Sequence, residues 1–425
     1  MRILVVGINY APERTAVAPF TTGLCEHLAS KGHEVTVITA FPYYPEWRVL
    51  DGYRGRLFMR EVVNGIPIRR VWHFVPRRAS SLLQRLAHDF SYAVSAFFAG
   101  LFVGPFDIIY CSSPPPAAAL SAFLLSRLKR VPYVIKLTDL ASDAALATGI
   151  VKNGFKVTTA RAIERFVYDR SKEIVCLCQG FIDKLTKRGI DRAKLHLITD
   201  WADTECVRPL TGANPFRDAC GVAGSQFLVL HTGNMGKKQD LLNMVRSADL
   251  TRFTTDIVWM LIGQGEEREQ IEQEIRRRNL GNFRLMDLQP MELLRQIYSA
   301  ADVLVLNQKA TVEDAVIPSK LLTYMAAGRP VVAAISEKSE AARYIREANC
   351  GLVVPPENPA ALVQGILELK QDLMLRKEMG MNGRAYAEVH FTRDKVLQCY
   401  DAFFRPWSGD GKQGGLNKEA TLVAQ

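Results

Sequence analysis

The sequence predicts an α/β protein built from two doubly wound domains, each a parallel sheet covered by helices. Apolar runs of strand length alternate with segments of helical periodicity, which is the pattern of repeated βαβ units. The chain also has 425 residues, more than one hydrophobic core usually serves, so two domains of about 200 residues each are expected. A hydrophobic content of 48% with 23% charged residues is that of an ordinary globular protein.

The segment 302–335 shows the repeated unit most clearly. An apolar run ends at Asn307, a polar loop follows, Pro318 and Ser319 begin a helix, and Gly328 ends it before another Val-rich run. A helix that begins behind the carboxyl end of a parallel strand offers unpaired N–H groups and a positive dipole end, which suits a diphosphate. An ordinary βαβ unit with a capped helix is the alternative interpretation.

The first domain begins with a buried strand at residues 2–7, a helix that stops at Gly32, and a second strand at residues 33–39. The first turn has no G-x-G-x-x-G pattern and carries Ala16 and Ala18 instead of glycines. A dinucleotide cofactor is therefore not supported.

A strand at residues 133–137 runs directly into Thr138 and Asp139. The carboxyl ends of buried parallel strands face the ligand crevice of such a sheet, so Asp139 is a catalytic candidate. The alternative is an aspartate that caps the following helix. Further strands at 107–111, 174–177 and 195–198 complete this sheet, and the stretch from Asp200 to Gly224 is predicted to link the domains.

The second domain begins with a strand at residues 227–231, followed by Gly233 and Gly236 and then a lysine pair ahead of a helix that begins near Asp240. Glycines let backbone N–H groups approach a phosphate closely, and Lys237 or Lys238 adds positive charge. The G-x-x-x-x-G-K-[ST] spacing of a P-loop is absent.

Residues 90–103 contain no charged side chain and are rich in Phe, Ala and Val. Fourteen residues are too few for a membrane-spanning helix, which needs about 20. The segment is interpreted first as a buried core helix. The alternative is a helix lying in a membrane interface, with Arg77, Arg78 and Arg85 on lipid headgroups and the aromatic side inserted.

The positive charge of the chain is concentrated in its first half. Residues 1–205 hold 27 Lys and Arg against 18 Asp and Glu, a net +9 of the total +10. This imbalance suits an anionic partner such as lipid headgroups, a phosphorylated lipid or nucleic acid, although solvated surface charge is an alternative. The eight cysteines follow neither a disulfide nor a zinc spacing, and no signal peptide opens the chain, so a reducing compartment is expected.

Several motifs together resemble the retaining GT-B glycosyltransferases of family 4, and most closely the colanic-acid and O-antigen branch that includes L-fucosamine transferases. The similarity extends to about Pro406. The motifs are Asn9-Tyr-Ala-Pro-Glu13, Gly32-His-Glu-Val35, Phe41-Pro-Tyr-Tyr-Pro-Glu-Trp47, Thr232-Gly-Asn-Met-Gly-Lys-Lys-Gln239, and Pro318-Ser-Lys320 with Met325-Ala-Ala-Gly-Arg-Pro330.

The resemblance implies two Rossmann-like domains facing across a cleft. It assigns an acceptor-binding domain to residues 1–205 and a nucleotide-sugar-binding domain to residues 206–391. A C-terminal helix is expected at residues 392–407, and the composition of residues 408–425 is that of a disordered tail.

The resemblance also assigns donor-binding roles. The phosphate-binding Arg/Lys pair of the family falls on Asn234 and Lys238, so only the lysine is kept. The second acidic residue of the family falls on Thr323, and Asp314 is taken as the contact to the donor sugar. The predicted donor-binding set is Gly233, Asn234, Lys238, Asp314, Ser319, Lys320 and Thr323, and the predicted catalytic set is Asp139, Lys238 and Asp314.

The implied activity is transfer of a sugar, with N-acetyl-L-fucosamine as one candidate, from a nucleotide diphosphosugar to a polyprenyl-diphosphate-linked saccharide. A UDP-sugar, or a GDP-sugar, serves as donor, and neither a cofactor nor a nucleic-acid partner is expected. No metal is expected either, because no Asp-x-Asp pair is present. The expected location is the inner face of the cytoplasmic membrane, reached from the cytoplasm through an anionic lipid surface. An inactive donor-binding scaffold and a GT-B nucleotide-sugar 2-epimerase are the alternatives.

Overall fold

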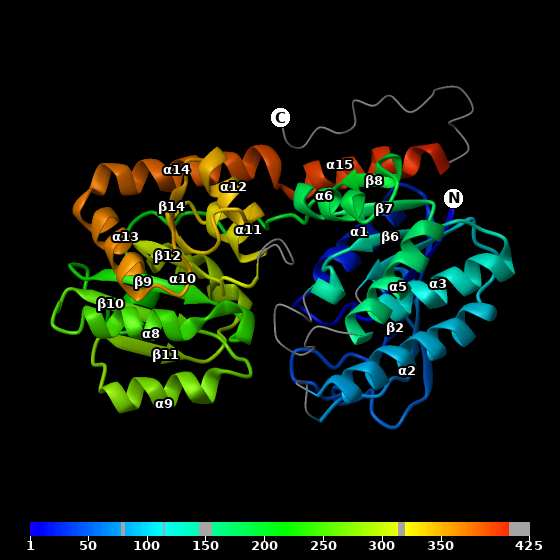
Figure 1. The fold of residues 1–425 in the computed structure, drawn as a ribbon, viewed down its shortest axis with the longest axis horizontal. Coiled ribbons are helices and arrows are strands. Elements are labelled where there is room, and N and C mark those ends of the chain that lie inside the picture. Colours follow the sequence, from blue (N-terminus) through cyan, green and yellow to red (C-terminus); the bar gives the residue numbers. More distant parts are fainter. Residues whose placement is uncertain (78–80, 114, 144–154, 313–318, 408–425) are drawn as a thin grey trace. The chain divides into compact units, whose positions relative to one another are not determined.

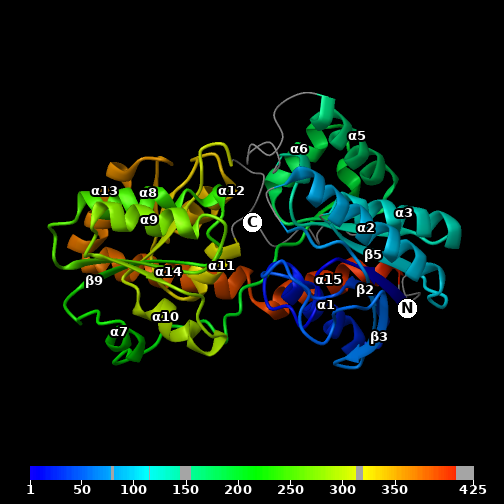
Figure 2. The ribbon, with the colours of Figure 1, turned by 90° about the horizontal axis from the view of Figure 1, so that it is seen from below.

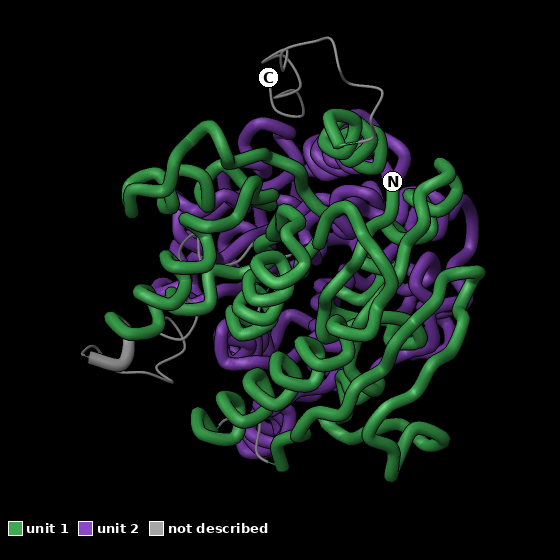
Figure 3. The backbone as a smooth tube through the Cα atoms, turned by 90° about the vertical axis from the view of Figure 1, so that its right-hand side faces the viewer, with its two compact units in different colours: residues 1–200, 396–425 green, residues 201–395 purple. Residues whose placement is uncertain are grey.

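The chain folds into two compact units (Figure 3). The computed structural model describes residues 1–77, 81–113, 115–143, 155–312 and 319–407. Unit 1 comprises residues 1–200 and 396–425, and unit 2 comprises residues 201–395. The sequence placed the domain boundary after residue 205, whereas the chain leaves unit 1 after Asp200 and returns to it at Val396.

Unit 1 is a doubly wound α/β unit, as the sequence predicted (Figure 1). Its sheet has the order β3-β4-β2-β1-β5-β6-β7-β8, and every neighbouring pair except β3 and β4 is parallel. The elements are β1 (Arg2–Val6), α1 (Ala18–Ser30), β2 (Glu34–Ala40), β3 (Phe58–Val63), β4 (Ile66–Val71), α2 (Leu82–Leu101), β5 (Ile108–Ser113), α3 (Pro116–Lys129), β6 (Tyr133–Leu137), α5 (Phe155–Arg170), β7 (Glu173–Cys176), α6 (Gln179–Lys187), β8 (Leu195–Leu197) and α15 (Arg393–Phe404).

Helices cover both faces of this sheet. Figure 2 shows α2, α3 and α5 on one side and α1 with α15 on the other. Helix α15 is fixed to unit 1 by polar contacts: the Asp401 carboxylate lies 2.7 Å from His27 Nε2 on α1, and the Tyr110 hydroxyl donates to the Tyr400 hydroxyl at 3.2 Å. Helix α15, which follows unit 2 in the sequence, is therefore part of unit 1.

The antiparallel hairpin of β3 and β4 is an element that the sequence analysis missed. Its turn is Asn64-Gly65, with both residues at positive φ, and Asn-Gly is the strongest short hairpin signal. Exposure alternates along β3, as expected for the edge strand of a sheet.

Helix α2 corrects the expectation of a buried core helix at residues 90–103. It is 20 residues long, and only one side of it is buried, through His88, Tyr92, Ala93, Ala96, Ala99 and Gly100. Apolar side chains on the other side are exposed, among them Phe90 at 63% and Phe98 at 57%. No helix in the described residues is long and apolar enough to cross a membrane.

Unit 2 is a six-stranded parallel sheet in the order β11-β10-β9-β12-β13-β14. One core joins the sheet to α8, α9 and α13, and a second core joins the opposite face to α10, α11 and α12. The elements are α7 (Pro215–Ala219), β9 (Phe227–Thr232), α8 (Leu241–Leu250), β10 (Ile257–Ile262), α9 (Arg268–Arg278), β11 (Phe283–Met286), α10 (Leu294–Ala300), β12 (Val303–Asn307), α11 (Ser319–Ala326), β13 (Val331–Ala334), α12 (Glu340–Glu347), β14 (Gly351–Val354), α13 (Pro359–Gln371) and α14 (Leu373–His390).

The strand order of unit 2 reverses direction between β9 and β12. The chain adds β10 and β11 on one side of β9 and then returns to add β12, β13 and β14 on the other. Loops that follow the two central strands diverge at such a switch point and leave a crevice at the carboxyl ends of the strands, where ligands bind in open α/β sheets.

Candidate active site

The glycine loop after β9 lies at this switch point and is held by backbone bonds. Gly233 N–H donates to the Ile262 carbonyl at 2.8 Å, and Met235 N–H donates to the Gln264 carbonyl at 2.8 Å. A Cβ at Gly263 would stand only 1.8 Å from the Gly233 carbonyl oxygen. The loops that follow β9 and β10 therefore pack backbone against backbone, which only glycine permits at that position.

Lys320, at the start of α11, reaches across to this loop. Its Nζ lies 3.0 Å from Nε2 of His231 and 3.4 Å from the backbone oxygen of Asn234. A Cβ at Gly233, whose φ is +111°, would come within 2.7 Å of Lys320 Cε. The predicted glycine loop and the predicted helix start thus form one site, and Gly233 leaves the space that the lysine stem occupies.

His231 fixes the direction of the Lys320 ammonium. The imidazole is fully buried, and its Nδ1 lies 2.8 Å from the Val305 carbonyl oxygen. A carbonyl only accepts, so Nδ1 carries the proton and Nε2 presents a lone pair to Lys320. Burial, reinforced by the nearby Lys320 charge, holds the pKa of His231 well below its ordinary value, so the ring is neutral.

Burial also lowers the pKa of Lys320, to about 7. The ammonium therefore loses its proton close to neutrality unless an anion binds beside it. A diphosphate placed at Lys320 would restore the charged form, because an opposite charge within a few ångströms favours it.

Lys238 occupies a short 3₁₀ turn, Lys237–Gln239, directly after the glycine loop. Its side chain is half-buried and forms no ion pair with the described residues, while its backbone oxygen accepts from Lys309 N–H at 3.0 Å. Asn234 is exposed on the same loop. Lys238 and Lys320 are thus two lysines carried by the same region of unit 2.

Helix α11 presents the remaining predicted donor residues. Ser319 is its exposed first residue and Thr323 is half-exposed four positions later, so these two lie on one face of the helix, and Lys320 lies three positions before Thr323. Asp314 lies outside the described residues. His231 was not anticipated; the only signal for it was a histidine inside the otherwise apolar strand β9.

Asp139 follows β6 in unit 1, as predicted, and is half-exposed at the carboxyl end of the sheet. Its neighbour in sequence, Asp143, is committed to an ion-pair cluster: both of its carboxylate oxygens accept from Arg188 at 2.6 Å, and Arg161 donates to it at 3.2 Å. Asp143 is therefore structural, and Asp139 is the half-exposed carboxylate that follows this strand.

The arginines predicted to face lipid are partly described. Arg77 is exposed after β4, and the Arg85 guanidinium lies over the Trp47 ring at 5.9 Å from its centroid. Arg78 lies outside the described residues. Within those residues no group of three His, Cys, Asp or Glu side chains is arranged to hold a metal ion.

Two family models match the chain in sequence. Residues 15–201 match the glycosyl transferase 4-like domain, and residues 215–386 match the glycosyl transferases group 1. The Escherichia coli protein WcaI, whose name describes a colanic acid biosynthesis glycosyl transferase, is 30% identical over 94% of this chain and 98% of its own length.

Solved structures share the fold at low sequence identity. Sucrose-phosphate synthase of Thermosynechococcus elongatus has a TM-score of 0.74 at 16% identity, covering 95% of this chain and 98% of that protein. HepE of Anabaena, solved with UDP-glucose, has a TM-score of 0.71 at 17% identity, covering 95% of this chain and 99% of that one.

Proposed function

Because the chain belongs to the GT-B glycosyltransferases, with a glycosyl transferase 4-like domain followed by a group 1 domain, we propose that it moves a sugar, with retention, from a UDP-sugar to a polyprenyl-diphosphate-linked saccharide. The observation that carries this proposal is the convergence of Lys320, the glycine loop and Lys238 at the switch point of unit 2.

The chemistry requires stabilisation of the leaving group. As the bond between the anomeric carbon and the diphosphate breaks, negative charge grows on the β-phosphate oxygen and positive charge grows on the sugar. Lys238, Lys320 and the N–H groups at the start of α11 supply positive potential where this charge develops. Asp139 of unit 1 would orient or deprotonate the acceptor hydroxyl.

The donor and the pathway are proposed from the relatives. HepE was solved with UDP-glucose, which favours a uridine donor over a guanosine one. The name of WcaI points to surface polysaccharide biosynthesis, and the colanic-acid branch makes UDP-N-acetyl-L-fucosamine one donor to include. The acceptor is then a lipid-linked saccharide at the inner face of the cytoplasmic membrane, and the exposed side of α2 is the proposed lipid contact.

The proposal is tested by incubating the purified protein with UDP- and GDP-sugars and a membrane extract, and measuring released nucleotide and labelled lipid. Release of UDP together with labelled lipid is the expected result. Lys238→Ala should lower turnover at saturating donor by about 10² to 10³, the loss typical of one transition-state donor. An unchanged rate would show that Lys238 does not stabilise the leaving group.

The same assay separates the two alternatives. A scaffold would bind the donor without releasing nucleotide, and an epimerase would change the sugar without labelling any lipid. Either outcome would overturn the transferase proposal.

A further inference from the structure

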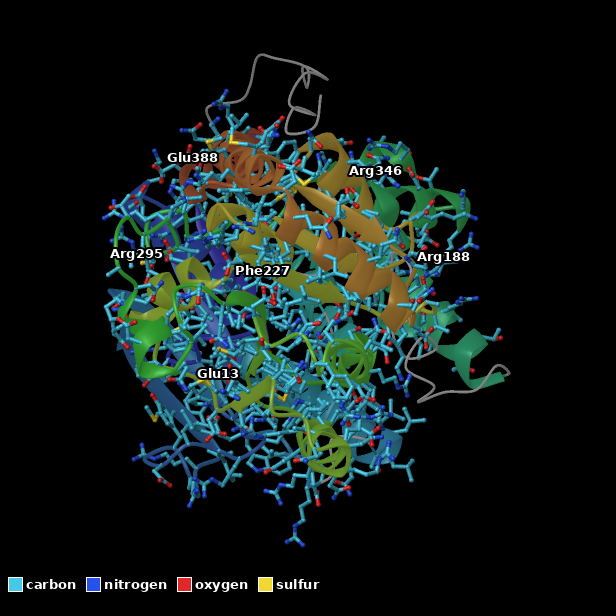
Figure 4. All side chains as sticks on the ribbon, turned by 90° about the vertical axis from the view of Figure 1, so that its left-hand side faces the viewer. Glu13, Arg188, Phe227, Arg295, Arg346 and Glu388 are labelled. Atoms are coloured by element: carbon cyan, nitrogen blue, oxygen red, sulfur yellow. The ribbon has the colours of Figure 1, made fainter. Side chains whose placement is uncertain are left out.

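The two central strands of unit 2 diverge before they end. Strand β9 begins at Phe227, which is labelled in Figure 4. Of its described residues, only Val229 and Leu230 pair with β12. Each strand continues further beside its outer neighbour, because β9 pairs with β10 as far as Thr232 and β12 pairs with β13 as far as Asn307. The divergence lies directly before the glycine loop, at the switch point of the sheet.

Side chains pair with the backbone where the central ladder is interrupted. The Val305 carbonyl on β12 accepts from His231 Nδ1 at 2.8 Å. On β9, Gly233 N–H donates to a β10 carbonyl at 2.8 Å, so the preceding Thr232 N–H points to the β12 side. This N–H donates to the hydroxyl of Tyr324 at 3.2 Å. Without the two side chains, a buried carbonyl and a buried N–H would lose these partners.

The Tyr324 hydroxyl attaches helix α11 to this strand. Tyr324 is completely buried and lies four residues after Lys320, so the two side chains leave the same face of the helix. Lys320 bonds His231 and Tyr324 bonds Thr232, so two successive turns of α11 are attached to two successive residues of β9. These two contacts fix the distance and the rotation of the helix start relative to the strand.

A second tyrosine is bonded to the same strand residue in a different way. Tyr298, on α10, is also buried, and its ring centroid lies 5.9 Å from that of Tyr324. The Tyr298 hydroxyl bonds the side-chain oxygen of Thr232 at 2.9 Å. The Tyr324 hydroxyl is also a partner of that side chain. Of the two tyrosines, however, it is Tyr324 that joins α11 to the backbone of β9.

The position of Lys320 tolerates little movement. Gly233 has a φ of +111°, and a Cβ at that residue would stand 2.7 Å from Lys320 Cε, so the lysine stem lies directly against the glycine loop. The ammonium lies 3.0 Å from His231 Nε2. A shift of α11 by about 1 Å would disturb both contacts, and misplacement by that amount typically lowers a rate by about 10²-fold.

We infer that Tyr324 is a positioning residue, whose bond to the Thr232 N–H holds α11 against β9 and so places Lys320 for the donor diphosphate. Tyr324 is completely buried, so it acts through Lys320 and not by touching the substrate. The inference rests on the proposed function for the identity of the donor.

Tyr324→Phe tests the inference, because it keeps the buried ring and removes the hydroxyl. Tyr298→Phe is the matched control, since it removes a hydroxyl from the same cluster without detaching α11. Both variants should lower the unfolding temperature, because each loses a buried hydrogen bond. Turnover at saturating donor should fall about 10- to 10²-fold in Tyr324→Phe and stay close to the wild-type rate in Tyr298→Phe.

The pH dependence of UDP-glucose affinity distinguishes positioning from a loss of stability. Burial lowers the pKa of Lys320 to about 7, so a lysine released into water regains a higher pKa. His231, the titratable group in contact with Lys320, is neutral in this range. By calorimetry, the wild-type protein and Tyr298→Phe should lose affinity as pH rises above 7. In Tyr324→Phe this loss should begin at least about one pH unit higher, because the released ammonium keeps its proton longer.

The inference is overturned if Tyr324→Phe keeps either the wild-type turnover or the wild-type pH dependence, or if Tyr298→Phe changes both equally. It is also overturned if the wild-type protein does not bind UDP-glucose.

Activity of the wild-type protein separates the two proposals. If it transfers sugar while Tyr324→Phe is unchanged, the transferase proposal stands and the role of Tyr324 falls. If it transfers no sugar, the transferase proposal falls, and the pH dependence alone decides whether Tyr324 positions Lys320.

Discussion

Lys320 is a lysine whose charge depends on what lies beside it. Its ammonium lies next to a neutral imidazole and a backbone oxygen rather than a carboxylate. Burial lowers its pKa to about 7. Below pH 7 the free site is already charged. Above pH 7 a diphosphate can bind to a charged lysine only if a proton is taken up with it.

We therefore expect the affinity for UDP-glucose to fall as pH rises from 7 to 9, by up to about tenfold per pH unit. UDP-glucose is the suitable probe because its diphosphate does not titrate in this range. Calorimetry in two buffers of different ionisation enthalpy should show proton uptake at pH 8 and little at pH 6. Lys320→Met should abolish the uptake, whereas Lys338→Met, an exposed lysine on the same unit, should preserve it. Equal uptake in Lys320→Met would show that another group titrates.

We expect substitution of Asp139 to lower turnover and substitution of Asp143 to lower the stability of the fold. Asp139→Asn should keep UDP-glucose affinity while turnover falls at least about tenfold, a floor below the roughly 10²- to 10⁴-fold that is typical for loss of a general base. Asp143→Asn should instead lower the unfolding temperature, because it weakens the pairs with Arg188 and Arg161. Loss of donor affinity in Asp139→Asn would contradict the acceptor role.

At the level of residues, the sequence singled out Lys238, Lys320 and Asp139 as candidates but not His231. The first three follow strand ends or begin helices, and the local pattern announces such positions. The role of His231 depends on Val305 and Lys320, 74 and 89 residues away in sequence. No local pattern contains that information, since the contacts arise only when β9 is placed between its neighbours.

At the scale of elements, α2 is the segment with the most direct functional consequence. Side chains three or four residues apart form one exposed apolar side, with Leu86 at 54%, Phe90 at 63% and Phe98 at 57%. Together with Arg77 and Arg85 this is the composition of a helix that lies in a membrane interface.

Replacing Leu86, Phe90 and Phe98 by Ser should weaken binding to anionic vesicles by more than about 10²-fold, since each inserted side chain contributes about 1.5 to 3 kcal/mol. Sedimentation with vesicles measures this. Replacing Phe253, an isolated exposed aromatic in unit 2 at 91%, is the matched control. High salt should release part of the wild-type protein, and equal binding to neutral and anionic vesicles would contradict the role of the arginines.

The regular elements were predictable where apolar runs are uninterrupted, as in β6, whose predicted bounds match those observed. The hairpin of β3 and β4 was missed although its turn sequence, Asn64-Gly65, is typical of a hairpin. Its strands carry Arg60, Glu61, Arg69 and Arg70, because β3 lies at a sheet edge and Arg70 serves as a buried anchor. Charged strands of this kind do not show the apolar pattern on which the predictions relied.

At the scale of the whole molecule, unit 1 is built from two separate parts of the chain. Helix α15 buries Tyr400 and Phe404 against it, with 0% and 1% exposure. Phe404→Ala should therefore cost about 3 to 5 kcal/mol of unit 1 stability. Tyr400→Phe removes only a hydroxyl, with its hydrogen bonds to Tyr110 and Lys136, and should cost about 1 to 3 kcal/mol.

Amide hydrogen exchange checks this prediction, because it reports each unit separately. Protection of β5 in unit 1 should fall in Phe404→Ala, and protection of β9 in unit 2 should not change. Equal loss in both strands would mean that the two units unfold as one.

Because the chain returns to unit 1 at Val396, unit 1 is completed after unit 2 during synthesis. When residues up to Lys395 have been synthesised, every element of unit 2 is present, but unit 1 still lacks most of α15. Tyr110 at the centre of its sheet then has no Tyr400 beside it. Unit 1, most of which is translated before unit 2, is thus completed after it. Until α15 has been synthesised, the apolar surface of unit 1 that α15 covers stays exposed, and a chaperone that binds nascent chains could bind there.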